Sequence, residues 1–128
     1  MRLFIYEGKI IFTTKKIGDI GEQEAENYIK KIGYKILERN WKYSRIGEID
    51  IIALDKSTIV FIEVKYRRSN TFGTAIESIT NKKLEKIYQT ALAYLGQTNL
   101  KYKNYRIEVI AIDKSSEIPL QHFKNISF

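Results

Sequence analysis

The central part of the chain reads RIGEIDIIAL over residues 45–54 and, after a short turn, IVFIEVKYR over residues 59–67. Both runs either alternate polar with apolar residues or are rich in β-branched ones, which is typical of β-strands. The four residues between them, Asp55-Lys56-Ser57-Thr58, favour a turn. We therefore predict a β-hairpin whose turn is centred on Lys56 and Ser57.

This register brings acidic side chains of the two strands together. It places Asp50 opposite Glu63 and Glu48 opposite Lys65, and residue parity puts Glu48 and Asp50 on one face of their strand. Like charges that face each other across strands destabilise a sheet. We therefore expect a cation that Asp50 and Glu63 share.

A helix is predicted before the hairpin, from Gly18 to Lys31. Asp19 is the expected N-cap and Glu22 follows it at the spacing of a capping box, while Gly33 ends the helix. The buried stripe consists of apolar residues at helical spacing, namely Ala25, Tyr28, Ile29 and Ile32. Glu22 projects close to this stripe, toward the carboxylates. The alternative is that Glu22 only caps the helix and complements its dipole.

The remaining elements complete an α/β protein. A first strand is predicted over residues 34–40, a second helix over 80–95 with Thr80 as N-cap and Gly96 at its end, a fourth strand over 105–113, and a closing segment from 118 to the end. Short connections make the first strands antiparallel, and the helical crossover makes the last strand parallel. The expected architecture is a mixed β-sheet flanked by helices, in the order αβββαβ. Residues 1–16 form a hairpin or arm, and 17–128 a single domain.

Basic and aromatic side chains surround the expected carboxylate cluster. Residues 41–45, predicted as a loop, interleave Trp41 with basic residues, which suits base stacking and phosphate contact. A basic loop over residues 66–74 follows Lys65. The candidate phosphate contacts are Arg45, Arg67, Arg68, Lys82, Lys83 and Lys86. As alternatives, Trp41 packs at the rim of the core, and the helical lysines form a solvated face.

Composition narrows the chemistry. The 128 residues include no cysteine and one histidine, His122, which excludes a disulfide framework, a thiol nucleophile and a multi-histidine metal cluster. Any metal would be a hard cation with oxygen ligands, such as Mg²⁺ or Mn²⁺. The net charge of +7 favours a polyanionic partner, although a lysine-rich solvated surface is the alternative. No membrane-spanning run or signal peptide is recognised, so a cytoplasmic protein is expected.

Together these residues suggest phosphodiester chemistry. Asp50 and Glu63 would hold the cation, and Lys65 would orient a water or stabilise negative charge in the transition state. Glu22 would reach the same site, and Glu48 would either be a further ligand or pair with Lys65. Glu-X-Lys alone is common on exposed strands, so a plain charged sheet face stays open as an alternative to a metal-dependent nuclease.

Several blocks of the sequence also match a known family. They are G-x-x-x-E-x-x-A at 18–25, Arg39-Asn40, GEIDIIA at 47–53, VFIEVKYR at 60–67, and further residues between Ala75 and Phe128. Through these residues the chain, from Gly18 onward, resembles the bacterial YraN family, also called UPF0102.

This resemblance implies a fold of the restriction-endonuclease-like, PD-(D/E)XK superfamily. That superfamily includes the archaeal Holliday-junction resolvases, which are magnesium-dependent dimers. By this resemblance the active site would consist of Glu22, Asp50, Glu63 and Lys65, and a homodimer is expected.

We therefore expect an endonuclease that uses Mg²⁺ or Mn²⁺ to hydrolyse DNA phosphodiester bonds, in branched or recombination and repair intermediates. The first alternative is a non-catalytic nucleic-acid-binding module that keeps this fold, in which Asp50→Asn would leave binding intact or tighten it. The second is an assembly protein whose basic face meets an acidic protein partner. Fold alone does not decide among them, because function resides in the site.

Overall fold

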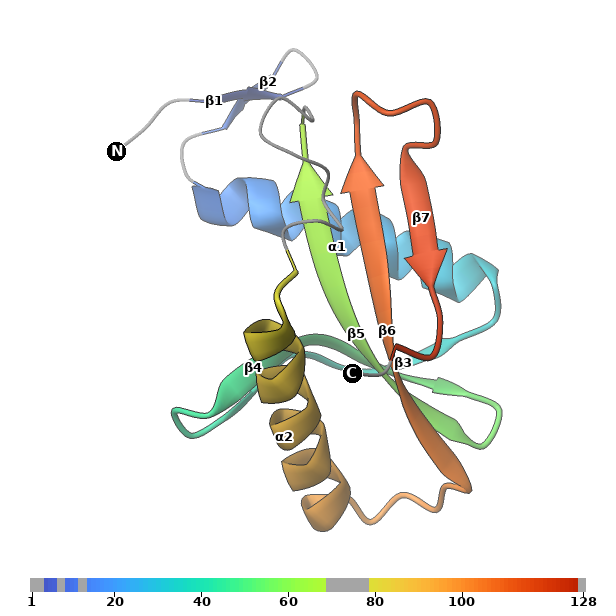
Figure 1. The fold of residues 1–128 in the computed structure, drawn as a ribbon. Coiled ribbons are helices and arrows are strands. Elements are labelled where there is room, and N and C mark those ends of the chain that lie inside the picture. Colours follow the sequence, from blue (N-terminus) through green and yellow to red (C-terminus); the bar gives the residue numbers. More distant parts are fainter. Residues whose placement is uncertain (1–3, 7–8, 12–13, 69–78, 127–128) are drawn as a thin grey trace.

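The structure, a computed structural model, describes residues 4–6, 9–11, 14–68 and 79–126 (Figure 1). Its elements in chain order are β1 (Phe4–Tyr6), β2 (Lys9–Ile11), α1 (Thr14–Lys31), β3 (Lys35–Tyr43), β4 (Gly47–Asp55), β5 (Thr58–Arg67), α2 (Asn81–Gln97), β6 (Asn104–Asp113) and β7 (Leu120–Phe123). The first two strands pair antiparallel in a small sheet of their own, with Phe4 opposite Ile11. Within the described part of the chain, no helix is long and apolar enough to cross a membrane.

The remaining strands form one mixed sheet in the order β3-β4-β5-β6-β7. Its strands pair antiparallel except β5 and β6, which run parallel because α2 crosses between them. This confirms the predicted α/β class and the order αβββαβ, to which β7 adds one strand. The closing segment is therefore also confirmed, since β7 lies antiparallel against β6.

The two helices cover different apolar clusters of the sheet. Ala25 and Ile29 of α1 pack in a cluster with Ile51 and Ile62, whereas Ile87 and Ala91 of α2 pack in another, with Ile52 and Phe61. Neighbouring residues of β4 and of β5 thus contribute to different clusters, as expected for strands buried on both sides. Figure 1 shows that the axes of the two helices run in different directions.

Helix α1 begins earlier than predicted and ends where predicted. It starts at Thr14, so Asp19 lies inside the helix and the predicted N-cap is wrong; Gly18 is accommodated within a helix at modest cost. At the other end Gly33 has φ = 98°, and the amide of Tyr34 donates to the carbonyl of Ile29 at 2.9 Å. This is the hydrogen bond of a Schellman motif, which needs a left-handed residue at the position of Gly33.

Strand β3 is longer than predicted. It continues through Trp41 to Tyr43 because its pairing with β4 extends to the pair Tyr43 and Gly47, so the predicted loop at 41–45 is wrong over its first three residues. Trp41 is half-buried and packs edge-on against Tyr94 of α2, with ring centroids 5.2 Å apart. These contacts support the core-rim interpretation of Trp41.

Halfway along β3 and β4, the side chains at alternate positions switch from one face of the sheet to the other. Arg39 contacts carboxylates of α1, whereas Trp41, two residues on, packs in the α2 cluster. In β4, Ile51 belongs to the α1 cluster and Ile49 to the α2 cluster. Asn40 has φ = 53° at this point. The strict alternation that placed Glu48 and Asp50 on one face therefore does not hold across it.

Helix α2 begins as predicted and ends later. The Thr80 hydroxyl accepts a hydrogen bond from the amide of Lys83 at 3.1 Å, which confirms Thr80 as N-cap. The helix continues through Gly96 to Gln97, and Thr98 caps it by donating its amide to the carbonyl of Tyr94, so the predicted terminal role of Gly96 is wrong. The side of α2 that faces the sheet includes Ile87 and Ala91, which are both fully buried.

Gly47 lets α2 approach the start of β4. A Cβ at this position would lie 2.6 Å from Oγ1 of Thr90, a residue that is itself fully buried. We expect Gly47→Ala to lower the free energy of unfolding by about 1–3 kcal/mol through overpacking. In chemical denaturation, Gly47→Ala should cost less in a Thr90→Ala background, because the Cβ of Thr90 is 3.8 Å away.

Gly96→Ala is the matched control for this prediction. Gly96 lies within α2 with nothing within 4 Å of an added Cβ, so alanine there should stabilise the protein by roughly 0.5–1 kcal/mol. Equal costs of Gly47→Ala in both Thr90 backgrounds would contradict the proposed contact.

Candidate functional site

The candidate site begins where the hydrogen-bonded ladder between β4 and β5 ends. The ladder runs from Asp55 opposite Thr58 to Ile51 opposite Ile62, which confirms the predicted turn at Lys56 and Ser57. Just beyond it, Oδ2 of Asp50 accepts the backbone amide of Val64 at 2.8 Å. A side-chain carboxylate thus takes the hydrogen bond of a β5 amide, and it lies beside Glu63.

Asp50 and Glu63 form a pair of acidic groups, of which Glu63 is buried and Asp50 is half-buried. Glu63 is 4% exposed. Burial, and then the charge of Glu63, raise the pKa of Asp50 to about 7. Burial also raises the pKa of Glu63, against the opposing charges of Lys83 and Lys65. Two carboxyl groups this close resist simultaneous ionisation, so one proton, or an added cation, relieves the repulsion.

Two lysines approach Glu63 from different elements. Nζ of Lys65, on β5, is 3.7 Å from Oε1 of Glu63, and Nζ of Lys83, on α2, is 3.9 Å from the same oxygen. The other carboxylate oxygen, Oε2, is buried and has no hydrogen-bond partner among the described residues. Buried polar atoms are nearly always satisfied, so an unpaired carboxylate oxygen indicates room for a further donor or a cation.

Glu22 reaches the same region from α1. Burial, and then the charge of Asp50, raise the pKa of Glu22. Oε1 of Glu22 also accepts a hydrogen bond from Nη2 of Arg39 at 3.3 Å, and Nη1 of Arg39 donates to Glu26 at 3.2 Å. Arg39 therefore orients Glu22, a role that is not predicted from the sequence.

Glu48 forms an ion pair outside this carboxylate cluster. Its Oε2 is 3.9 Å from Nζ of Lys42, which is directly opposite it on β3. The ion pair predicted with Lys65 is thus replaced by a pair with Lys42, because the two strands change their facing between Glu48 and Asp50. Lys65 pairs with Glu63 instead.

The predicted phosphate-binding residues divide into two groups. Lys83 joins the carboxylate site, as described above. The others lie elsewhere: Lys82 and Lys86 are exposed on α2, Arg45 is exposed in the turn between β3 and β4, and Arg67 and Arg68 lie at and just after the end of β5. Of the predicted basic loop at 66–74, the part after Arg68 lies outside the described residues.

The donor set suits a hard divalent cation held by few protein ligands. No group of three or more acidic, histidine or cysteine side chains is positioned to hold a metal ion within residues 19–68 and 79–126. Asp50 and Glu63 supply two carboxylates, and Oε2 of Glu63 is unpaired. Mg²⁺ commonly binds one or two carboxylates and keeps several waters, so the residues present fit it.

The fold and site define a small α/β protein with a carboxylate–lysine cluster at the end of a central hairpin. The chain belongs to the uncharacterised protein family UPF0102, whose model matches residues 21–112. The match spans Glu22, Asp50, Glu63, Lys65 and Lys83.

Three relatives illustrate this membership. The UPF0102 protein of Sulfurihydrogenibium sp. is 46% identical over 95 residues, which cover 74% of this chain and 82% of the relative. That of Clostridium acetobutylicum is 47% identical over 98 residues, covering 77% and 80%. That of Persephonella marina is 44% identical over 108 residues, covering 84% and 90%.

Proposed function

We propose that this protein is a metal-dependent phosphodiesterase that acts as an endonuclease on DNA. The observation that carries the proposal is the pair Asp50 and Glu63. Oε2 of the buried Glu63 has no hydrogen-bond partner among the described residues, and its Oε1 lies near two lysines. Such a pair is unfavourable unless a cation or a proton relieves it. A cation held by these carboxylates, together with the two ammonium groups near Glu63, would suit a substrate that gains negative charge as it reacts.

Each side chain has a role in this proposal. Asp50 and Glu63 would hold Mg²⁺ or Mn²⁺, which when bound supplies an acidified water and neutralises charge on the phosphoryl group. The Val64 amide fixes the Asp50 carboxylate, and Arg39 fixes Glu22 at the edge of the site. Lys65 places its ammonium beside Glu63, where it would orient the attacking water or stabilise phosphoryl oxygens.

Exposed basic residues would hold the substrate. Arg45, Lys82 and Lys86 are exposed, Arg67 is the last residue of β5, and Arg68 follows it. Contacts of this kind neutralise phosphates without reading sequence. The resemblance to Holliday-junction resolvases adds branched intermediates as the preferred DNA, and a homodimer as the form that acts.

Cleavage assays test this function. Labelled four-way junctions, flaps, single strands and plain duplexes would be incubated with Mg²⁺, Mn²⁺ or a chelator, and binding would be recorded on the same samples. We expect metal-dependent cuts that disappear in Asp50→Ala and Lys65→Ala. Glu117→Ala and Lys101→Ala, which remove exposed charges, serve as matched controls and should cut normally.

The other outcomes decide between the alternatives. Tight binding without cuts by any of the proteins would replace this proposal with a non-catalytic nucleic-acid-binding module. If neither binding nor cutting occurs at low salt, the nucleic-acid partner is wrong and an acidic protein partner becomes the better hypothesis, since phosphate contacts are strongest at low salt.

A further inference from the structure

We propose that Lys83 is a second catalytic lysine, which takes the cation's place beside Glu63 in the metal-free protein and moves to the scissile phosphate when a divalent cation binds there. This inference rests on the proposed function and adds a residue and a movement to it. Lys83 comes from α2, on the far side of the long connection after β5, so the Glu-X-Lys motif does not contain it.

The geometry holds Lys83 near Glu63 without locking it. Its backbone is fixed, because its amide donates to the Thr80 hydroxyl at the start of α2. Its ammonium is 3.9 Å from Oε1 of Glu63, which is beyond hydrogen-bond distance, and its side chain is 41% exposed. The ammonium can therefore leave Glu63 without breaking a hydrogen bond, and its partly exposed side chain has open solvent on one side.

Charge balance gives the reason for the movement. The carboxylates of Asp50 and Glu63, when both are ionised, balance the ammonium groups of Lys65 and Lys83. A divalent cation held by these carboxylates would leave the group with two positive charges in excess. The repulsion acts on both lysines, and Lys83 has the more exposed side chain, 41% against 29% for Lys65. A phosphodiester that approaches the cation meets both the excess charge and a displaced ammonium.

The position of Lys83 in its helix agrees with an anionic partner. Positive side chains are unfavourable at a helix N-terminus, where the helix dipole is positive. The first turn of α2 nevertheless has no acidic residue and contains both Lys82 and Lys83. Lys82 is exposed, whereas Lys83 turns toward the sheet and Glu63. A phosphodiester carries its negative charge on two non-bridging oxygens, so ammonium groups from two different elements can each contact a different oxygen.

Two measurements on the same variants test the proposal. The first is Mn²⁺ affinity without DNA, by titration followed by electron paramagnetic resonance. Lys83→Met should bind Mn²⁺ about three- to tenfold more tightly, because it removes the competing charge at Glu63. Lys101→Met, which removes an exposed charge beyond the other end of α2, should leave the affinity unchanged.

The second measurement is cleavage at saturating Mn²⁺. Lys83→Met should lower kcat by about 10²-fold and change KM much less, since the contact forms with the reacting phosphate. Lys83→Arg should recover part of kcat because it keeps the charge. Lys82→Met should mainly raise KM, as expected for a residue that only holds the substrate.

For Lys83→Met the proposal predicts a higher Mn²⁺ affinity and a lower kcat. A defect in folding would instead lower both the Mn²⁺ affinity and kcat. Unchanged or weaker Mn²⁺ affinity in Lys83→Met overturns the competition at Glu63. If Lys83→Met binds Mn²⁺ more tightly but keeps full kcat, in an assay where the unaltered protein cuts, only the catalytic role of Lys83 is overturned. An unaltered protein that binds Mn²⁺ and cuts nothing overturns the proposed function and the phosphate contact with it.

Discussion

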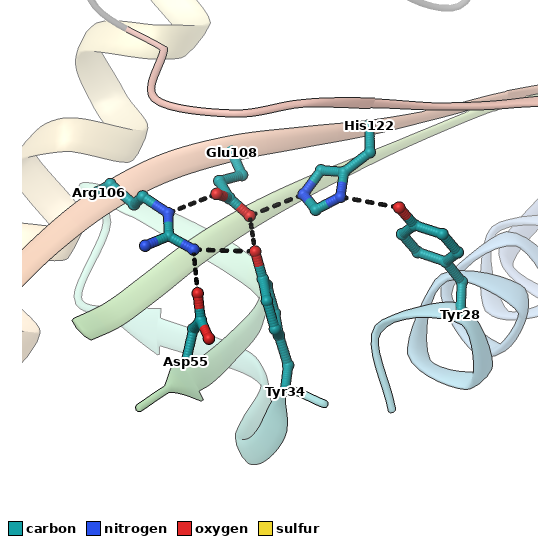
Figure 2. Close-up of polar contacts among 6 residues, drawn as sticks. All are labelled: Tyr28, Tyr34, Asp55, Arg106, Glu108 and His122. Carbon is teal, nitrogen blue, oxygen red and sulfur yellow. Dashed lines mark hydrogen bonds and ion pairs between the residues drawn. The ribbon is translucent and has the colours of Figure 1, made fainter. Parts of the chain in front are cut away.

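Arg106→Met is expected to lower the free energy of unfolding by about 3–5 kcal/mol, because it leaves a buried carboxylate without its cation. The carboxylate is that of Glu108, which is fully buried on β6. Figure 2 shows Arg106 between Glu108 and Asp55, and its Nη2 is 2.7 Å from Oδ2 of Asp55. Removing one partner of a buried pair is costly even where the pair itself contributes little, because the other charge stays desolvated.

The contacts around Glu108 tie together parts of the chain that are distant in sequence (Figure 2). Tyr34, which follows α1, donates its hydroxyl to Oε1 of Glu108 at 2.9 Å and accepts from Nη2 of Arg106 at 2.9 Å. Nε2 of His122, on β7, lies 2.7 Å from the same carboxylate oxygen. The hydroxyl of Tyr28 on α1 lies 3.0 Å from Nδ1 of His122. The network thus joins α1, β4, β6 and β7.

The effect of Arg106→Met should depend on pH. Burial opposes the ionisation of Glu108, but hydrogen bonds from His122, Arg106 and Tyr34 outweigh it and lower the pKa below its ordinary 4.5. Stability from a lowered carboxyl pKa is present above the unfolded value and is lost as the pH falls through the folded value. The variant should therefore lose most stability near neutral pH and differ less from the unaltered protein in acid.

Chemical denaturation at pH 7 and at pH 3–4 measures this effect. The double variant Arg106→Met with Glu108→Met should cost less than Arg106→Met alone, because no buried charge is left unpaired. Lys30→Ala is the surface control: its ion pair with Glu26 at 3.5 Å involves a lysine side chain that is 57% exposed, so it should cost less than about 0.5 kcal/mol. If Arg106→Met lowers the free energy of unfolding by less than Lys30→Ala does, the proposed role of the network is contradicted.

Local patterns in the sequence predict the elements of this fold well. The turn at Lys56 and Ser57 sets the β4–β5 register because only two residues connect the strands. The Thr80 cap and the Gly33 end are likewise predicted from their own neighbours. These features depend on contacts within a few residues, which the order of amino acids specifies directly.

Contacts between distant elements escape such patterns. Strict alternation of side chains does not hold between Glu48 and Asp50, because the side chains of β3 and β4 switch faces of the sheet near Asn40. The sequence predicts phosphate binding for Lys83, because helical spacing gives its position on α2 but not the distance from α2 to Glu63. The two carboxylate partners of Arg39 are Glu22 and Glu26, which lie on one face of α1 at positions i and i+4. This spacing indicates that one cation can bind both carboxylates, but it does not specify which residue supplies the cation.

Asp50→Asn is expected to stabilise the protein by about 1–3 kcal/mol near pH 8 and to have no effect near pH 4. Burial, and then the charge of Glu63, raise the pKa of Asp50 from its ordinary 3.8 to about 7. Between these two values the unfolded chain releases a proton that the folded protein keeps, so the stability of the unaltered protein falls as the pH rises through this interval. Asparagine has no proton to release and avoids the loss.

The substitution keeps the local hydrogen bond. The amide oxygen of asparagine can accept the backbone amide of Val64, as Oδ2 of Asp50 does at 2.8 Å. The gain therefore reports the removed charge. The full shift would correspond to about 4 kcal/mol at 1.36 kcal/mol per pH unit, and we expect less because Glu63 shares the titration.

Denaturation of both proteins from pH 4 to pH 8 measures the difference, with Glu117→Gln as an exposed carboxylate control that should change little. Mn²⁺ at pH 8 should raise the melting temperature of the unaltered protein more than that of Asp50→Asn, because a bound cation relieves the same repulsion. Equal or lower stability of Asp50→Asn at pH 8 would mean that the carboxylates are already neutralised within the protein. A gain would mean that the folded chain holds a charge which lowers its stability, as expected where a side chain is kept for binding or chemistry.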